Sequence, residues 1–303
     1  MTGHSLLTRS SKRQVVLGVV LGLALTLGLA VPSAHAADGK DSVAISPGMQ
    51  QIEAKAGTTK TGKFTVINDG ATPYKFIVYS RPYSVTNENY DAQFEKTSKN
   101  TDLYQWVKFA QVSYHLNPGE RIEIPYDLHI PATAAPGGHY GVIFAETQPE
   151  SGQDASVLRK KRVGSIVLAT VDGAVKREGK VLNSVVTFWQ TAPPLSASNR
   201  VENSGNTDFQ ANVLTKVTDL FGSVKYSEQK NYVVYPGTIR NITFQWKDAP
   251  WFGLFKVNQT VTVLNTPTNT SHFVLMTPRW LALVVLILVI VGAGYGLLQR
   301  KRR

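Results

Sequence analysis

Residues 121–130 read RIEIPYDLHI and give the clearest indication of the fold. Every second residue in this stretch is Ile, Tyr or Leu, and the residues between them are charged, polar or proline. Side chains of a β-strand point alternately to opposite faces, so this alternation predicts a strand with one buried face and one face in water. A helix would bring its apolar residues back at every third or fourth position instead.

The same alternation recurs in the second half of the chain. Apolar and polar side chains alternate over residues 242–246 and again over residues 255–263. Proline and glycine, which favour tight turns, stand together at 47–48, 118–119, 136–138 and 236–237. The pattern predicts an all-β chain of short strands joined by tight turns.

A weak internal repeat predicts two copies of one architecture. The segment VINDGAT at 66–72 matches VENSGNT at 201–207, and a Pro-Gly turn follows each copy in the same order. Strands and turns at this spacing are typical of immunoglobulin-like β-sandwiches. We therefore predict two such sandwiches in tandem, with no disulfide in either because the chain has no cysteine.

A polar stretch marks the expected boundary between the two sandwiches. The segment TQPESGQDAS at 147–156 has no large apolar side chain, and four basic residues follow it at 159–162. This composition is typical of a linker. We predict a first domain at 37–150, a linker at 151–162 and a second domain at 163–275.

The N-terminal segment has the three parts of a secretory signal peptide. It carries a basic start, an apolar run at 15–31 and small residues immediately before Ala37. We expect a signal peptide at 1–36 that is cleaved after Ala36. An exported chain without cysteine fits a bacterial envelope better than a eukaryotic ectodomain.

A second apolar run predicts a transmembrane helix. Residues 280–298 contain no charged side chain, and as a helix they would be roughly 28 Å long, close to the thickness of a bilayer core. Four basic residues follow at 300–303, and the positive-inside rule places them in the cytoplasm. We expect a single-pass protein of the cell membrane, with both sandwiches extracellular and a cytoplasmic tail at 299–303.

The distribution of charge argues against a nucleic-acid partner. The formal net charge is +11, but the two ends of the chain hold eight basic residues and no acidic one. Residues 37–278 therefore keep 24 basic and 21 acidic residues, a net charge of +3. This charge is too small for nucleic-acid binding driven by electrostatics.

No arrangement of residues indicates catalysis or a cofactor. The histidines after residue 36 are separated from one another, and none has the spacing of a metal site. The sequence has no serine-hydrolase elbow, and its acidic residues are scattered. We predict that the chain is not an enzyme and has no catalytic residue, no metal site and no cofactor.

Several segments of the first domain resemble the peptidoglycan-binding domain of WxL-interacting proteins, the DUF916-type family. They are ISP at 45–47, FTVIN at 64–68, WV at 106–107 and APGGHYGVIF at 135–144. The order of signal peptide, two sandwiches, membrane helix and basic tail is similar as well. The resemblance implies a surface protein that contacts the cell wall through its first domain and partners through its second.

Aromatic and basic residues supply the candidate binding site. Aromatic rings stack on the apolar faces of sugars, and basic side chains bind anionic groups. The polar insertion at 79–106 favours outward-facing tyrosines, whereas we expect its tryptophan to be buried. The candidate ligand-binding residues are Tyr83, Tyr90, Trp106, His139, Tyr140, Arg159, Lys160, Lys161 and Arg162.

Two functions remain open. The first is an extracellular protein that binds peptidoglycan or surface-protein partners without catalysis. The second is a membrane-tethered, chaperone-like assembly factor that holds exported proteins by pairing their strands with an open sheet edge. Sedimentation with protein-free peptidoglycan distinguishes them, because only the first predicts binding to the wall polymer.

Overall fold

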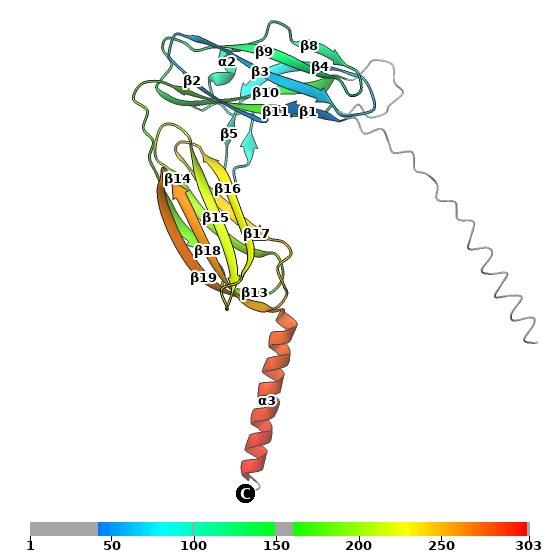
Figure 1. Cartoon of the computed structure of the whole chain (residues 1–303), viewed down its shortest axis with the longest axis vertical. Helices are drawn as coiled ribbons and strands as arrows, with labels where there is room; N and C mark the ends of the chain where they lie inside the picture. Colours follow the sequence, from blue (N-terminus) through cyan, green and yellow to red (C-terminus); the bar gives the residue numbers. More distant parts are fainter. Residues whose placement is uncertain (1–41, 99, 149–159, 302–303) are drawn as a thin grey trace, which may run out of the picture. The chain divides into compact units, whose positions relative to one another are not determined.

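The computed structural model describes residues 42–98, 100–148 and 160–301 of the 303-residue chain (Figure 1). The predicted signal peptide at 1–36 lies outside the described residues, as do most of the predicted linker and the last two residues of the tail. The described strands form two β-sandwiches within a single unit, Ser42–Arg303. The predicted all-β architecture of two immunoglobulin-like sandwiches is confirmed.

The first sandwich consists of two sheets. One sheet has the order β1-β3-β9-β7 and the other has the order β2-β11-β10-β4-β8. The first contains β1 (Val43–Ser46), β3 (Thr59–Asn68), β7 (Val107–Lys108) and β9 (Arg121–His129). The second contains β2 (Met49–Ala54), β4 (Tyr74–Pro82), β8 (Ser113–Leu116), β10 (Gly137–Gln148) and β11 (Arg162–Val171). A short helix, α2 (Leu103–Trp106), and a hairpin of β5 (Ser84–Val85) and β6 (Ala92–Gln93) complete it.

The stretch at residues 121–130 forms β9, as its alternation predicts. Ile124, Tyr126 and Leu128 are each at most 2% exposed, and the residues between them are exposed. Antiparallel pairing sets Ile124 opposite Phe64 of β3, which is also buried. One face of the β3–β9 pair therefore lies in the core between the two sheets.

The second sandwich also consists of two sheets. Their orders are β12-β14-β17 and β13-β19-β18-β15-β16. The three-stranded sheet contains β12 (Gly179–Val185), β14 (Leu195–Asn203) and β17 (Thr238–Trp246). The five-stranded sheet contains β13 (Trp189–Gln190), β15 (Phe209–Asp219), β16 (Val224–Val234), β18 (Gly253–Val263) and β19 (Thr266–Met276). The strands predicted at 242–246 and 255–263 are confirmed as parts of β17 and β18.

The internal repeat corresponds to one hydrogen-bonded turn that is built twice. In the first sandwich, the buried Asn68 donates to the carbonyl oxygens of Thr72 and Leu116. In the second, Asn203 donates to the carbonyl oxygens of Thr207 and Val234 at 2.9 and 2.7 Å. In both copies the glycine of the following Pro-Gly turn donates its N–H to the asparagine carbonyl at 2.9 Å. The side-chain amide thus satisfies strand ends that would otherwise be buried and unpaired.

The sheet pairing places one strand differently from the expected domain boundary. The strand β11 lies within the range predicted for the second domain, yet it pairs antiparallel with β10 and parallel with β2. It therefore belongs to the first sandwich, and the chain passes to the second sandwich between β11 and β12. The strands on either side of the predicted linker, β10 and β11, are thus neighbours in one sheet, and residues 149–159 lie outside the described residues.

The predicted membrane-spanning segment at 280–298 forms part of the helix α3 (Arg279–Lys301). In the described portion of the chain, however, no helix meets the length and apolarity that a bilayer crossing requires. The prediction of a transmembrane helix at 280–298 is therefore not supported by the described residues.

Candidate functional site

The strand β10 is buried on both of its faces. Every residue from Gly137 to Ala145 is buried, although only one face of the sheet lies on the sandwich core. Ile143 and Ala145 point into that core. Tyr140, Val142 and Phe144 point the other way and join a second apolar cluster with Leu168, Tyr83 and Tyr235. This second cluster brings the outer face of the first sandwich against residues of the second.

Three tyrosines from distant parts of the chain hold this cluster together. The Tyr90 and Tyr235 rings stack with their centroids 5.5 Å apart, and the Tyr235 hydroxyl donates to the Tyr83 hydroxyl at 3.4 Å. The Tyr90 hydroxyl accepts the backbone N–H of Tyr235 at 3.0 Å. It donates to Thr238 Oγ1 at 2.5 Å, because the Thr238 hydroxyl already donates to the Tyr235 carbonyl. Such a chain of bonds defines a single arrangement of the cluster.

Tyr140 links the cluster to a partly buried carboxylate, that of Asp208. Its hydroxyl donates to Oδ1 of Asp208 at 3.1 Å. Burial raises the pKa of Asp208 above its usual value, although the hydrogen bond from Tyr140 acts in the opposite direction. Burial, together with the neighbouring Asp208, also raises the pKa of Tyr140. The tyrosine therefore remains a neutral donor over the whole physiological range.

His139 is held by two acceptors beside the same strand. Its Nδ1 lies 2.6 Å from Oδ1 of Asp102, and its Nε2 lies 2.8 Å from the carbonyl oxygen of Ala135. Both nitrogens must donate, which requires the imidazolium form. Burial lowers the pKa of His139, but the two hydrogen bonds outweigh it and the pKa is raised overall. The ring centroid of Trp106 is 4.6 Å away, so the pair lies against the core.

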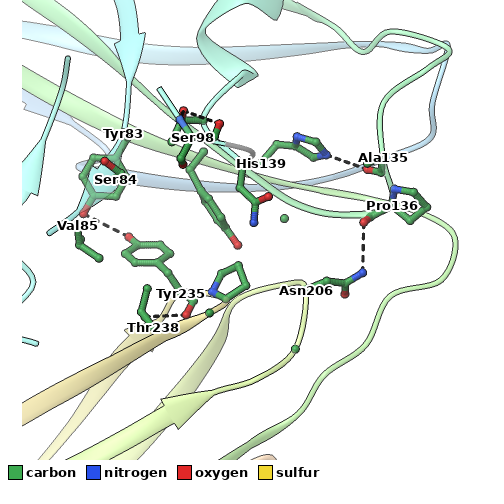
Figure 2. Close-up of a pocket in the computed structure, with 17 residues that line it drawn as sticks. Tyr83, Ser84, Val85, Ser98, Ala135, Pro136, His139, Asn206, Tyr235 and Thr238 are labelled. Atoms are coloured by element: carbon green, nitrogen blue, oxygen red, sulfur yellow. Dashed lines mark hydrogen bonds between the residues drawn. The ribbon is translucent and has the colours of Figure 1, made fainter. Parts of the chain in front are cut away.

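A cavity of about 490 Å³ lies between these groups. Figure 2 shows Tyr83 and Val85 on one side of it and Ala135 and Pro136 on the other. Asn206 closes a further side, where its Nδ2 donates to the carbonyl oxygen of Pro136 at 3.2 Å. Among the residues that the structure describes, His139 is the one ionisable group of the lining apart from tyrosine hydroxyls, and it is paired with Asp102.

The basic run packs beside the aromatic cluster. The Arg162 guanidinium lies 4.3 Å from the centroid of the Phe144 ring, and Nζ of Lys160 lies 3.5 Å from Glu146. Lys161 is tied to β10 by its backbone N–H, which donates to Thr147 Oγ1 at 2.9 Å. Arg159 lies outside the described residues.

Beside the basic run, β11 has an edge that β2 does not cover. The strand β2 pairs with β11 only from Ile166 to Val171. At the start of this pairing, the N–H of Ile166 donates to the carbonyl oxygen of Gly48 at 2.9 Å, and Ser165 Oγ donates to that of Pro47 at 2.7 Å. In the part of the chain that the structure describes, no strand pairs with the backbone of Arg162–Ser165 on that side, although the side chain of Ser165 is buried against Pro47 and Gln50. We call these four residues the open edge.

Three other strands with uncovered edges carry features that block the addition of a strand. The uncovered part of β9 contains Pro125, and the uncovered part of β19 contains Pro267. Proline has no N–H to offer a partner strand. The edge strand β16 carries Lys225, Glu228 and Lys230, and charged side chains protect sheet edges from pairing. The open edge of β11 contains Gly164 instead and has no proline.

The structure brings the sequence-predicted site residues together in three groups. Tyr83, Tyr90 and Tyr140 meet in the tyrosine cluster, Trp106 meets His139, and the described basic residues lie beside Phe144. Their rings are covered: Tyr83, Trp106, His139 and Tyr140 are between 3% and 7% exposed, as Trp106 was expected to be. Sequence reasoning missed the open edge, because nothing local shows where β2 begins to pair with β11. Among the described residues no group of three or more possible metal ligands occurs.

No protein-family model matches the chain, and no curated protein matches it. Among solved structures, the CupB2 chaperone of Pseudomonas aeruginosa is 10% identical to this chain, with a TM-score of 0.37. The match covers 77% of this chain and 100% of the chaperone chain. The E. coli chaperone DraB is 11% identical to this chain, with a TM-score of 0.37, and the match covers 79% of this chain and 97% of DraB. The CsuC–CsuE chaperone–subunit complex of Acinetobacter baumannii is 10% identical, with a TM-score of 0.39 and coverages of 76% and 97%.

Two predictions are corrected at this point. The resemblance to WxL-interacting proteins of the DUF916 type is not supported, since no family model matches and the three similar structures named above contain chaperones. Peptidoglycan binding is not supported either, and the rings of Tyr83, Trp106 and Tyr140 are buried, so that they offer no face to a sugar. At identities near 10% and TM-scores below 0.5, these likenesses carry no argument about the partner.

Proposed function

We propose that this chain is a non-catalytic binding protein that accepts an extended segment of a protein partner as an added strand on the open edge. One observation carries the proposal: β2 leaves the first four residues of β11 uncovered, and these residues include no proline and one glycine. The activity is that of a chaperone-like assembly factor for other proteins. The signal-peptide pattern of the sequence favours partners that are exported with it.

The backbone of the open edge points its hydrogen-bonding groups outward. Along a strand, the N–H and C=O of successive residues point alternately to the two sides. The N–H of Ile166 points toward β2, so those of Gly164 and Arg162 point the same way, where β2 is missing. Lys161 points the opposite way, as its carbonyl accepts the N–H of Thr147 on β10 at 2.9 Å. Two residues therefore offer two donors and two acceptors to an incoming strand.

The residues around the open edge determine which side chains the partner strand should carry. Val163 of the open edge and Ile45 of β1 are partly buried against the core, so side chains of the partner that face them should be apolar. On the other face, Arg162 lies over Phe144, which favours an aliphatic or acidic side chain over a basic one. The preferred partner is thus a segment that alternates apolar and non-basic residues. Main-chain bonds supply affinity and the alternate side chains supply specificity.

The test removes one outward donor and keeps the fold. Arg162→Pro deletes the outward N–H, and Arg162→Ala deletes the same side chain but keeps that N–H. A proline at 162 restricts residue 161 to extended conformations, which the strand already requires. The probe is a fluorescent synthetic peptide of alternating valine and threonine, about ten residues long, as is typical of a strand. Anisotropy titration of the full chain measures the dissociation constant.

We expect Arg162→Pro to bind the peptide about three- to tenfold more weakly than Arg162→Ala, which is the value of one backbone hydrogen bond. A peptide with the same side chains and methylated nitrogens at alternate positions should not bind. Equal affinity of the two variants, or equal binding of the methylated peptide, would show that strand pairing at this edge does not occur. Circular dichroism of both variants confirms that the sandwich is retained.

A further inference from the structure

Three loops and the start of α3 meet at one end of the second sandwich. Pairing sets Gly253 of β18 opposite Met276 of β19, and Phe255 opposite Asp219 of β15. The turn at 220–223, the loop at 247–252 and the segment at 277–279 therefore lie side by side. The segment before β13 joins them, because the N–H of Leu275 donates to the carbonyl of Phe188. Figure 1 shows α3 leaving this end beside β13.

Large apolar side chains project into water at this end. Their exposed fractions are 95% for Phe221, 54% for Trp251 and 49% for Phe252. The Phe252 ring also meets Trp280 of the first turn of α3, edge to face, at 6.4 Å between centroids. We call these exposed residues the aromatic end; its members are Phe188, Trp189, Leu220, Phe221, Trp251, Phe252 and Trp280. Contiguous exposed apolar surface of this kind marks an interaction site.

The turn that carries Phe221 is held firmly in its exposed position. Oδ1 of Asp219 accepts the backbone N–H groups of Phe221 and Ser223, both at 2.9 Å. The other carboxylate oxygen pairs with Lys225 at 3.0 Å, and Gly222 takes the positive φ of 83° that closes the turn. The phenylalanine is therefore presented outward by a preformed turn.

Basic side chains lie behind the aromatic tips. Lys256 is three residues into β18, about 10 Å from the end of the strand at the usual rise per residue. Lys247 and Arg279 flank the loop and the helix start, and these three basic residues make no ion pair with any residue that the structure describes. Asp248 is the one acidic residue near them without an ion pair in the described residues, so the end carries a net positive charge.

This layering fits a bilayer surface. Aromatic side chains enter the boundary between headgroups and acyl chains to a depth of about 5–10 Å, and basic side chains then lie level with the phosphates. We propose that the aromatic end docks on a lipid surface that carries anionic headgroups. Phe221, Trp251 and Phe252 insert, and Lys247 and Lys256 contact lipid phosphates. The inference is independent of the strand-pairing proposal.

The absence of cysteine from the chain allows a direct test. Phe221→Cys in the full chain is labelled with an environment-sensitive nitrobenzoxadiazole dye. Val112→Cys is the matched control, because Val112 is 54% exposed but lies in the first sandwich, between β7 and β8. Both proteins are mixed with vesicles of phosphatidylcholine and phosphatidylglycerol, with and without lipids brominated on their acyl chains.

We expect the emission at position 221 to shift to shorter wavelength and to be quenched by the brominated lipids several times more strongly than at position 112. Replacing Lys247 and Lys256 by glutamine should reduce the shift, as should vesicles of phosphatidylcholine alone. A dye at 221 that stays in water overturns the proposal, whether the chain fails to bind vesicles or is held on them by another segment. A shift that depends on protein concentration without lipid also overturns it, because the occupant is then a second copy of the chain.

Discussion

Asp102→Asn should reveal whether the imidazolium of His139 stabilises the first sandwich. The side chain of His139 is 4% exposed, and both its nitrogens donate to acceptors at 2.6 and 2.8 Å. Asparagine keeps an acceptor oxygen for Nδ1 but removes the negative charge. Without the carboxylate, the effect of burial outweighs the remaining hydrogen bond, so the pKa of His139 falls. The ring then becomes neutral, and one of its two nitrogens can no longer donate a hydrogen bond.

The expected loss follows from the change in bond type. A hydrogen bond to a charged group contributes about 1.5–3 kcal/mol, and a neutral one about 0.5–1.5 kcal/mol. The Asp102 side chain is 39% exposed, so screening by water reduces the expected difference to about 1 kcal/mol. The pKa of His139 is raised in the folded state. Its stabilisation is therefore fully present below the unfolded value of about 6.5 and is lost as the pH rises through the folded value.

Urea unfolding of the full chain, followed by tryptophan fluorescence, measures the difference. Asp102→Asn should lower the free energy of unfolding by about 1 kcal/mol at about pH 5.5 and by much less at about pH 9. Asp172→Asn is the control, since Asp172 is an exposed aspartate at the end of β11. The reasoning is refuted if the two pH values give the same loss, or if the nitrogen resonances of His139 show a neutral ring at the lower pH.

Two further substitutions test the packing. In Gly62→Ala the added methyl group falls on the buried Tyr126 ring of the facing strand, so unfolding should become easier by about 1–3 kcal/mol. In Gly48→Ala the added methyl group has no neighbouring atom, so the free energy of unfolding should fall far less in the same urea titration. Tyr140→Phe removes the donor to Asp208 and should cost about 1–2 kcal/mol near neutral pH. Because the folded pKa of Asp208 is raised, protonation favours folding, and this loss should shrink as the pH falls toward 4; a pH-independent loss argues against the assignment.

Local periodicity was enough to predict three of the strands, β9, β17 and β18. In β9 the alternate residues Ile124, Tyr126 and Leu128 are buried, because a strand with one face on a core can bury only every second side chain. The repeated asparagine turn was also visible, since the residues that form it lie within seven positions of one another. Its second set of partners, Leu116 and Val234, was not, because these lie 48 and 31 residues away.

The placement of β11 and the double burial of β10 could not be predicted from the pattern. A run of consecutive apolar residues is compatible with a buried helix segment or with a strand covered on both faces. The tyrosines at 83 and 90 read as outward-facing because their neighbours are polar. Their actual partner, Tyr235, is about 150 residues further along the chain.

Paired strands in two related halves can be predicted from the residue pattern, since strand formation and turn chemistry depend on neighbouring residues. The positions at which the strands begin and end relative to one another are visible only in the folded chain. The uncovered edge of β11 exists because β2 begins its pairing at Ile166, and the aromatic end exists because three separate loops meet beside α3. Both features depend on contacts between segments that are far apart in the chain, and such contacts cannot be predicted from a local pattern of side chains.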